Sequence, residues 1–112
     1  MKSFNVYRYE DVNGKDLIEE FILNATKPQK SKIIRLVDYL EKFGISGQNP
    51  TLKKLSGFPI WELRSLGRDN IRIFCAPYNY GIVLLHIIIK KTQKTSQRDI
   101  TISVKRLNEL LD

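Results

Sequence analysis

The first half of the chain combines one short alternating pattern with two helical patterns. Residues 4–9, with the sequence FNVYRY, alternate in the way that predicts a short strand. A break follows at Asn13 and Gly14, and apolar residues then recur every three or four positions. Pro28 suits the first turn of a second helix, and Gly44 suits its end. The predicted buried faces of the two helices consist of Leu17, Ile18, Phe21 and Ile22, and of Ile33, Leu36, Val37 and Leu40.

Three strands are predicted in the second half. They have the sequences IWELRS (60–65), IRIFCA (71–76) and IVLLHIIIK (82–90). Residues 67–70 and 77–81 provide turns between them. The third strand is apolar on both of its faces, so we expect it at the centre of a sheet.

A final helix completes the expected fold. Residues 96–99 (SQRD) have the pattern of a capping box, with Asp in place of the usual Glu or Gln. An apolar stripe follows in Ile100, Val104, Leu107 and Leu111. The order β-α-α-β-β-β-α and the length of 112 residues predict one α+β domain over residues 1–112, with a small, mainly antiparallel sheet packed against helices.

Positive charge is concentrated in the second half. Residues 1–50 hold eight Lys or Arg and seven Asp or Glu, which gives +1, whereas residues 51–112 hold eleven and five, which gives +6. This excess favours a nucleic acid or an acidic protein as the partner.

Several classes of protein are disfavoured by the same sequence. The one cysteine, Cys75, cannot form an internal disulfide, and no group of Cys and His has zinc-site spacing. The first residues lack the apolar stretch of a secretory signal, and the longest apolar run is too short for a membrane helix. We therefore expect a cytoplasmic protein with no cofactor, no metal site and no membrane partner.

Strand periodicity predicts a charged face on the sheet. Glu62 and Arg64 point away from Trp61 and Leu63, and Arg72 likewise lies opposite its apolar neighbours. Adjacent strands can therefore bring Arg64 and Arg72 together. Two interpretations stay open: a site for a polyanion, or a salt-bridged surface in which Glu62 or Asp69 pairs with the arginines. Lysines enter and leave the sheet beside this face: Lys53, Lys54, Lys90 and Lys91.

The motifs together resemble a known toxin family. LKKLSGFPIWELRS, then RIF, LLH and IIKKTQKT, and finally a helix with VKRL, are similar to the HigB type of toxin in the RelE/ParE superfamily. The resemblance spans roughly residues 50–110. It implies the toxin of a toxin–antitoxin pair, which cleaves messenger RNA on the ribosome and is silenced by a helix-turn-helix, HigA-like antitoxin.

The resemblance carries over to individual residues only in part. Arg72 matches the arginine of the family's third-strand motif, Arg64 the basic residue of the preceding strand, and Lys90 and Lys91 the basic pair after the last strand. Ser96 stands where close relatives usually have proline. The catalytic tyrosine of some relatives has no counterpart between residues 90 and 112, so the groups that transfer protons are left unassigned.

These residue types suit RNA cleavage by the RNA's own 2′-hydroxyl, which requires no metal ion. The protein must orient the strand and stabilise charge on the phosphate. Arg64 and Arg72 are assigned to the phosphate, Lys90 or Lys91 to proton transfer or charge stabilisation, and Glu62 is a candidate general base. Candidate contacts to the RNA backbone, for which simple solvation is an equal alternative, are Lys53, Lys54, Arg68 and Lys94.

Three other residues have structural interpretations. His86 lies within an apolar strand, where a hydrogen-bonded structural histidine is favoured over a catalytic one. Trp61 is expected in the core rather than stacked on a base, and Cys75 is expected to be inert.

Two other functions compete with RNA cleavage. A ParE-like toxin would have the same fold and inhibit DNA gyrase by binding it, which leaves the basic residues without a catalytic task. A basic nucleic-acid-binding module would bind without cleaving, and the loss of one cation would weaken it only modestly.

Overall fold

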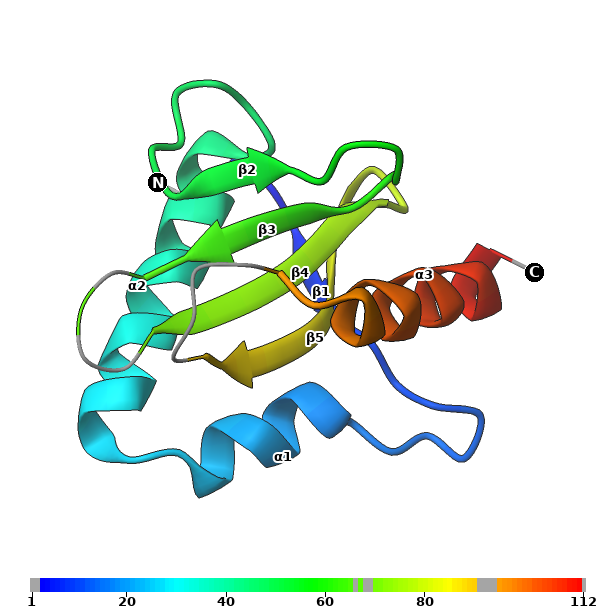
Figure 1. Ribbon diagram of the computed structural model, residues 1–112, viewed down its shortest axis with the longest axis horizontal. Helices are drawn as coiled ribbons and strands as arrows, with labels where there is room; N and C mark the ends of the chain where they lie inside the picture. Colours follow the sequence, from blue (N-terminus) through cyan, green and yellow to red (C-terminus); the bar gives the residue numbers. More distant parts are fainter. Residues whose placement is uncertain (1–2, 66, 68–69, 91–94, 112) are drawn as a thin grey trace.

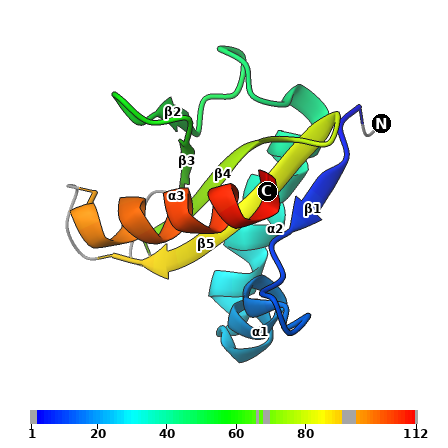
Figure 2. The same cartoon turned by 90° about the vertical axis from the view of Figure 1, so that its right-hand side faces the viewer.

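A mixed sheet forms the centre of the molecule, with helices on both of its faces (Figures 1 and 2). The computed structural model describes residues 3–65, 67, 70–90 and 95–111. In this part of the chain the strands lie in the order β1-β5-β4-β3-β2. The elements are β1 (Val6–Arg8), α1 (Leu17–Asn24), α2 (Lys27–Phe43), β2 (Leu52–Lys54), β3 (Trp61–Arg64), β4 (Ile71–Tyr78), β5 (Gly81–Ile89) and α3 (Gln97–Leu111).

The α+β class, the three helices, the first strand and the three strands of the second half are confirmed, and the structure adds one short strand. This strand, β2, pairs with β3 at the edge of the sheet. Its three residues, LKK, are too few to show an alternating pattern. At the opposite edge β1 runs parallel to β5, whereas the other pairs are antiparallel.

Local signals define the ends of the helices. The side chain of Asp16 accepts a hydrogen bond from the Glu19 amide, which caps α1. Thr26 and Gln29 form a complete capping box at the start of α2. Gly44 ends that helix with a φ of 65°, a conformation that glycine adopts without steric cost.

The β4–β5 turn is tighter than the sequence predicts. Pro77 and Tyr78 continue strand β4, so that only Asn79 and Tyr80 connect it to β5. Both have positive φ, at 49° and 60°. Such a two-residue turn requires left-handed backbone at both positions.

The sheet separates two apolar clusters. The cluster against α1 and α2 includes Ile18, Ile33, Leu36, Leu63 and Ile73. The cluster on the α3 side includes Phe74, Val83, Leu85 and Leu107. Cys75 is fully buried, and burial raises the pKa of its thiol to about 12, which agrees with an inert cysteine. Of the helices in the described ranges, none has the length and apolar character needed to cross a bilayer.

Candidate functional site

Arg64 and Arg72 meet on the same sheet face, as strand periodicity predicts. They are directly paired residues on the antiparallel strands β3 and β4. Glu62 lies two residues before Arg64 and contacts both arginines. Its Oε1 accepts from Nε of Arg64 at 2.5 Å, and its Oε2 lies 3.7 Å from Nη1 of Arg72.

A threonine joins these three charged groups. The hydroxyl of Thr95 donates to Oε2 of Glu62 at 2.9 Å. The hydroxyl oxygen of Thr95 in turn accepts from Arg64 Nη2 and from Arg72 Nη1, each at 3.4 Å. We call Glu62, Arg64, Arg72 and Thr95 the Glu62 cluster. Because Thr95 precedes α3, the cluster depends on that helix being docked on the sheet.

Only part of the Glu62 cluster reaches the surface. The side chains of Glu62 and Arg72 have no exposed area, whereas 21% of the Arg64 side chain is exposed. Burial lowers the pKa of Arg72, the charge of Glu62 opposes this effect, and the charge of Arg64 adds to it. Of the three charged groups, Arg64 is the one placed to meet a ligand.

A second polar cluster lies beside the first on the α3 side of the sheet. We call Lys90, Asp99, His86, Ser96 and Arg106 the Asp99 cluster. The carboxylate of Asp99 accepts from the Ser96 hydroxyl at 2.5 Å and lies 3.7 Å from the Lys90 ammonium. Burial alone would raise the pKa of Asp99, but the hydrogen bonds from Ser96 and His86 and the charge of Lys90 outweigh it and lower that pKa.

The protonation of His86 follows from its two neighbours. Arg106 can only donate, and its Nη1 lies 3.4 Å from Nδ1 of His86, so Nδ1 is an acceptor. Nε2 therefore carries the proton and donates to Oδ1 of Asp99 at 2.9 Å. The pKa of His86 is lowered, chiefly by burial, with the charge of Arg106 adding to the effect. This geometry and the stacking on Phe74 agree with the structural histidine expected from the sequence.

The two predicted lysines of β2 point to different faces. Lys53 pairs with Glu62 and shares its face, where it is exposed. Lys54 pairs with Trp61 and therefore points to the opposite face. Its ammonium lies 5.5 Å from the Trp61 ring centroid and donates to the Phe58 carbonyl. Trp61 itself packs against the core, as expected.

The remaining predicted residues divide into two groups. Lys90 follows β5 and has 17% of its side chain exposed. Arg68, Lys91 and Lys94 lie outside the described residues, as does Asp69, the other proposed partner of the arginines.

Sequence patterns missed Thr95, Asp99 and Arg106 as members of the two clusters. The capping-box pattern drew attention to Asp99, and the Ser96 hydroxyl does accept from the Asp99 amide at 3.2 Å. Its carboxylate, however, bonds to the Ser96 hydroxyl and to the distant His86. Arg106 donates to the Leu85 carbonyl at 2.7 Å and lies over the Tyr9 ring. The contacts of Asp99 with His86 and of Arg106 with Leu85 and Tyr9 depend on the docking of α3.

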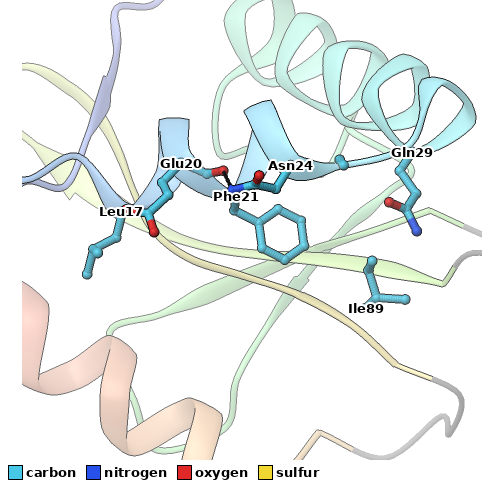
Figure 3. A pocket seen from close by; sticks show the side chains of 7 residues that line it. Leu17, Glu20, Phe21, Asn24, Gln29 and Ile89 are labelled. Carbon is cyan, nitrogen blue, oxygen red and sulfur yellow. Dashed lines mark hydrogen bonds between the residues drawn. The ribbon is translucent and has the colours of Figure 1, made fainter.

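A separate hollow of about 360 Å³ lies between α1, the start of α2 and the end of β5 (Figure 3). Apolar Leu17, Phe21 and Ile89 line it beside polar Glu20 and Gln29. No sequence-predicted site residue contributes to its lining. Among the described residues, no three His, Cys, Asp or Glu side chains gather closely enough to hold a metal ion.

Comparison with models of known protein families identifies the family of the chain. Residues 20–108 match the family model described as "Phage derived protein Gp49-like (DUF891)". The chain belongs to the Gp49-like family. This family is part of the RelE/HigB-type group of toxins from toxin–antitoxin systems, and Gp49-like membership therefore implies a cognate antitoxin. None of the curated proteins matches the chain. The matched segment contains every residue of the Glu62 and Asp99 clusters.

Proposed function

We propose that this Gp49-like protein is a HigB-like endoribonuclease that cleaves messenger RNA, on the ribosome, and so arrests translation and growth. The observation that carries the proposal is the Glu62 cluster. It holds two arginines in fixed positions, with one of them partly exposed. A second group of polar residues, including the Lys90 ammonium, lies on the same face.

The proposed reaction uses the RNA's own 2′-hydroxyl as the nucleophile. Its oxygen forms a bond to the adjacent phosphorus while the bond from phosphorus to the 5′-oxygen breaks. The 2′-hydroxyl loses a proton and the leaving 5′-oxygen gains one. The products are a 2′,3′-cyclic phosphate and a 5′-hydroxyl end. Negative charge grows on the phosphate oxygens during this step, and preorganised donors stabilise it.

Arg64 is the proposed direct donor to the phosphate. Its Nε is fixed by Glu62, which orients the guanidinium, and part of the side chain faces solvent. Arg72 lies behind it without exposed surface, so in this proposal it acts by holding Glu62 and adding positive charge beneath the phosphate. Both oxygens of Glu62 already accept hydrogen bonds, which favours an orienting role over that of general base.

Lys90 is the proposed group for proton donation or charge stabilisation. The carboxylate of Asp99 lies 3.7 Å from its ammonium and holds it on the α3 side of the sheet. Lys91 is the alternative from the same basic pair. Lys53, on the face of Glu62, is proposed to contact the RNA backbone, and Lys54, Arg68 and Lys94 are weaker candidates for that task.

The proposed partner is a HigA-like antitoxin with a helix-turn-helix domain, and the proposed place of action is the cytoplasm. Positive charge in residues 51–112 supports an antitoxin segment of opposite charge.

The test is to express the chain without its antitoxin and to map RNA ends in the arrested cells. We expect new 5′-hydroxyl ends within translated messages. Arg64→Ala should reduce cleavage roughly 100- to 1000-fold, and Arg64→Lys should restore little, because lysine lacks the bidentate fork. Lys105→Ala, on the exposed surface of α3, is the matched control. Arrest without new RNA ends, accompanied by gyrase-dependent DNA damage, would instead support the ParE-like function.

A further inference from the structure

A basic groove borders the Glu62 cluster. It has a volume of about 500 Å³ and is lined by α2, the segment leading into β2 and the end of β3. Among the described residues, four cations and no carboxylate line it. We call it the α2–β3 groove, and its polar and aromatic lining consists of Lys32, Arg35, Tyr39, Lys53, Arg64 and Ser65.

The absence of acidic lining distinguishes this groove from other hollows of the described chain. Each of four others includes at least one carboxylate, contributed by Glu20, Glu109, Glu41, or Asp38 with Glu41. The first half of the chain has a net charge of only +1. Nevertheless, α2 presents Lys32 and Arg35 where they add to the cations of β2 and β3. A single-sign groove of this kind attracts a polyanion.

Two of the groove cations have no acidic partner among the described residues. Within the described residues, neither Arg35 nor Lys53 takes part in an ion pair, and both are exposed. By contrast, Lys42, on the same helix as Arg35, pairs with Asp38 at 3.0 Å. Cations without an acidic partner can neutralise phosphates without first breaking an ion pair.

Arg64 connects the groove to the candidate site. Arg64 is part of the groove lining, and its side chain bonds to Glu62 and Thr95. A strand whose phosphate lies on Arg64 can therefore continue towards Lys53 and Arg35. Tyr39 supplies an aromatic ring in the same lining. Cations that follow a backbone, together with an aromatic surface for bases, are typical of sites for single-stranded nucleic acid.

We infer that the α2–β3 groove binds the single-stranded RNA that flanks the scissile phosphate, with Arg35 and Lys53 on backbone phosphates and Tyr39 against a base. This inference rests on the proposed function, because it assumes that RNA reaches Arg64. It assigns to α2 a binding role beyond its contribution to the core.

The test measures binding without cleavage. A fluorescent single-stranded oligoribonucleotide with 2′-O-methyl groups cannot be cut by its own 2′-hydroxyl, so fluorescence anisotropy reports affinity alone. Titrations of the full chain at 50–200 mM salt give both Kd and its salt dependence. The variants are Arg35→Ala, Lys53→Ala and Tyr39→Leu. Lys105→Ala, an exposed cation on α3, is the matched control, and thermal unfolding verifies that each variant is folded.

Each loss of a phosphate contact should weaken binding and lower the slope of log K against log salt by about 0.7. Tyr39→Leu should weaken binding about fivefold or more with the slope unchanged, because stacking involves no counterion release. Lys105→Ala should match the unaltered chain.

Unchanged affinity and slope in both Arg35→Ala and Lys53→Ala would overturn the inference. So would an unaltered chain that fails to bind the oligonucleotide at 50 mM salt. If the same two substitutions weaken binding of the antitoxin but not of RNA, the groove serves an acidic protein segment and the inference is wrong.

Mapping RNA ends in cells separates the two proposals. If Arg35→Ala and Lys53→Ala still cleave RNA and bind it with unchanged affinity, the inferred role of the groove is wrong and the proposed function stands. If the groove substitutions weaken RNA binding but the unaltered chain produces no new RNA ends, the proposed function is wrong and the inferred role of the groove stands.

Discussion

Arg64 and Arg72 stand directly opposite each other on neighbouring antiparallel strands, and one carboxylate, that of Glu62, contacts both. Like charges at directly opposed positions destabilise a sheet unless a group of opposite charge compensates them. Glu62 provides this compensation, and Thr95 adds hydrogen bonds to all three side chains. The two arginines therefore differ in what they can do: Arg64 is partly exposed, and Arg72 is buried.

Arg72→Ala should lower stability as well as activity. The change leaves the buried carboxylate of Glu62 with Arg64 as its remaining cationic partner in the cluster. We expect a loss of about 3 kcal/mol in the free energy of unfolding, at the lower end for breaking a buried pair. Urea denaturation measures this loss. The double variant Glu62→Gln with Arg72→Met removes both charges and should regain much of the stability without regaining toxicity. A single variant as stable as the unaltered chain would contradict the coupling.

Lys90 and Lys91 should not be equivalent. The ammonium of Lys90 is held beside Asp99, on the face that carries Arg64 and Arg72. If strand geometry continues through both lysines, Lys91, which lies outside the described residues, points to the opposite face. Lys90→Ala should abolish growth arrest, and Lys91→Ala should have a mild effect. Growth curves and RNA end mapping after induction measure both. Equal and small effects would indicate diffuse binding of the RNA backbone.

Stability should fall as the pH is lowered from 7 to 5. The pKa of His86 is lowered in the folded protein from an ordinary value of 6.5, so the unfolded chain takes up a proton first. Below pH 6.5 this proton uptake lowers the free energy of unfolding, and the loss continues until His86 of the folded protein also becomes protonated. Asp99 has a lowered pKa as well, but its contribution is lost only below its ordinary value of 3.8. The two effects therefore occupy different pH ranges.

Thermal unfolding across this pH range tests the effect of His86, which is the one histidine of the chain. His86→Gln keeps a donor for Asp99 but does not titrate, so its stability should vary less between pH 7 and pH 5. The same pH dependence in this variant would rule out His86 as its source.

Antitoxin binding should be fast and sensitive to salt. With +6 on residues 51–112, electrostatic attraction should raise the association rate, and added salt should lower that rate. Apolar contacts respond less to salt, so the dissociation rate should change little. Stopped-flow measurements at low and high ionic strength separate the two rates. An association rate indifferent to salt would mean that the antitoxin avoids the basic face.

Strand periodicity was sufficient to place Arg64 and Arg72 on one face, because alternation is a local property of the chain. The same periodicity could not show what covers that face. Thr95 and Glu62 are 33 positions apart in the sequence, and His86 and Asp99 are 13 apart. Neither contact can be inferred from the local sequence pattern. The burial of Arg72 follows from such distant contacts. Strand β2 was missed because three residues are too few to show alternation. The basic groove was missed because Lys32 and Arg35, taken from the sequence alone, look like ordinary solvent-exposed residues of a helix.

The order of the elements, in which α3 follows every strand of the sheet in the described chain, also bears on the timing of synthesis. Strand β1 is made first, but Val6 pairs with Ile82, which is made 76 residues later (82 − 6). Thr95 and Asp99 follow later still, and their hydrogen bonds hold Glu62, Arg64 and His86 in place. A nascent chain that ends before residue 95 therefore lacks the Thr95 hydrogen bonds to both arginines. The ribosome must therefore translate as far as α3 before both clusters can assemble.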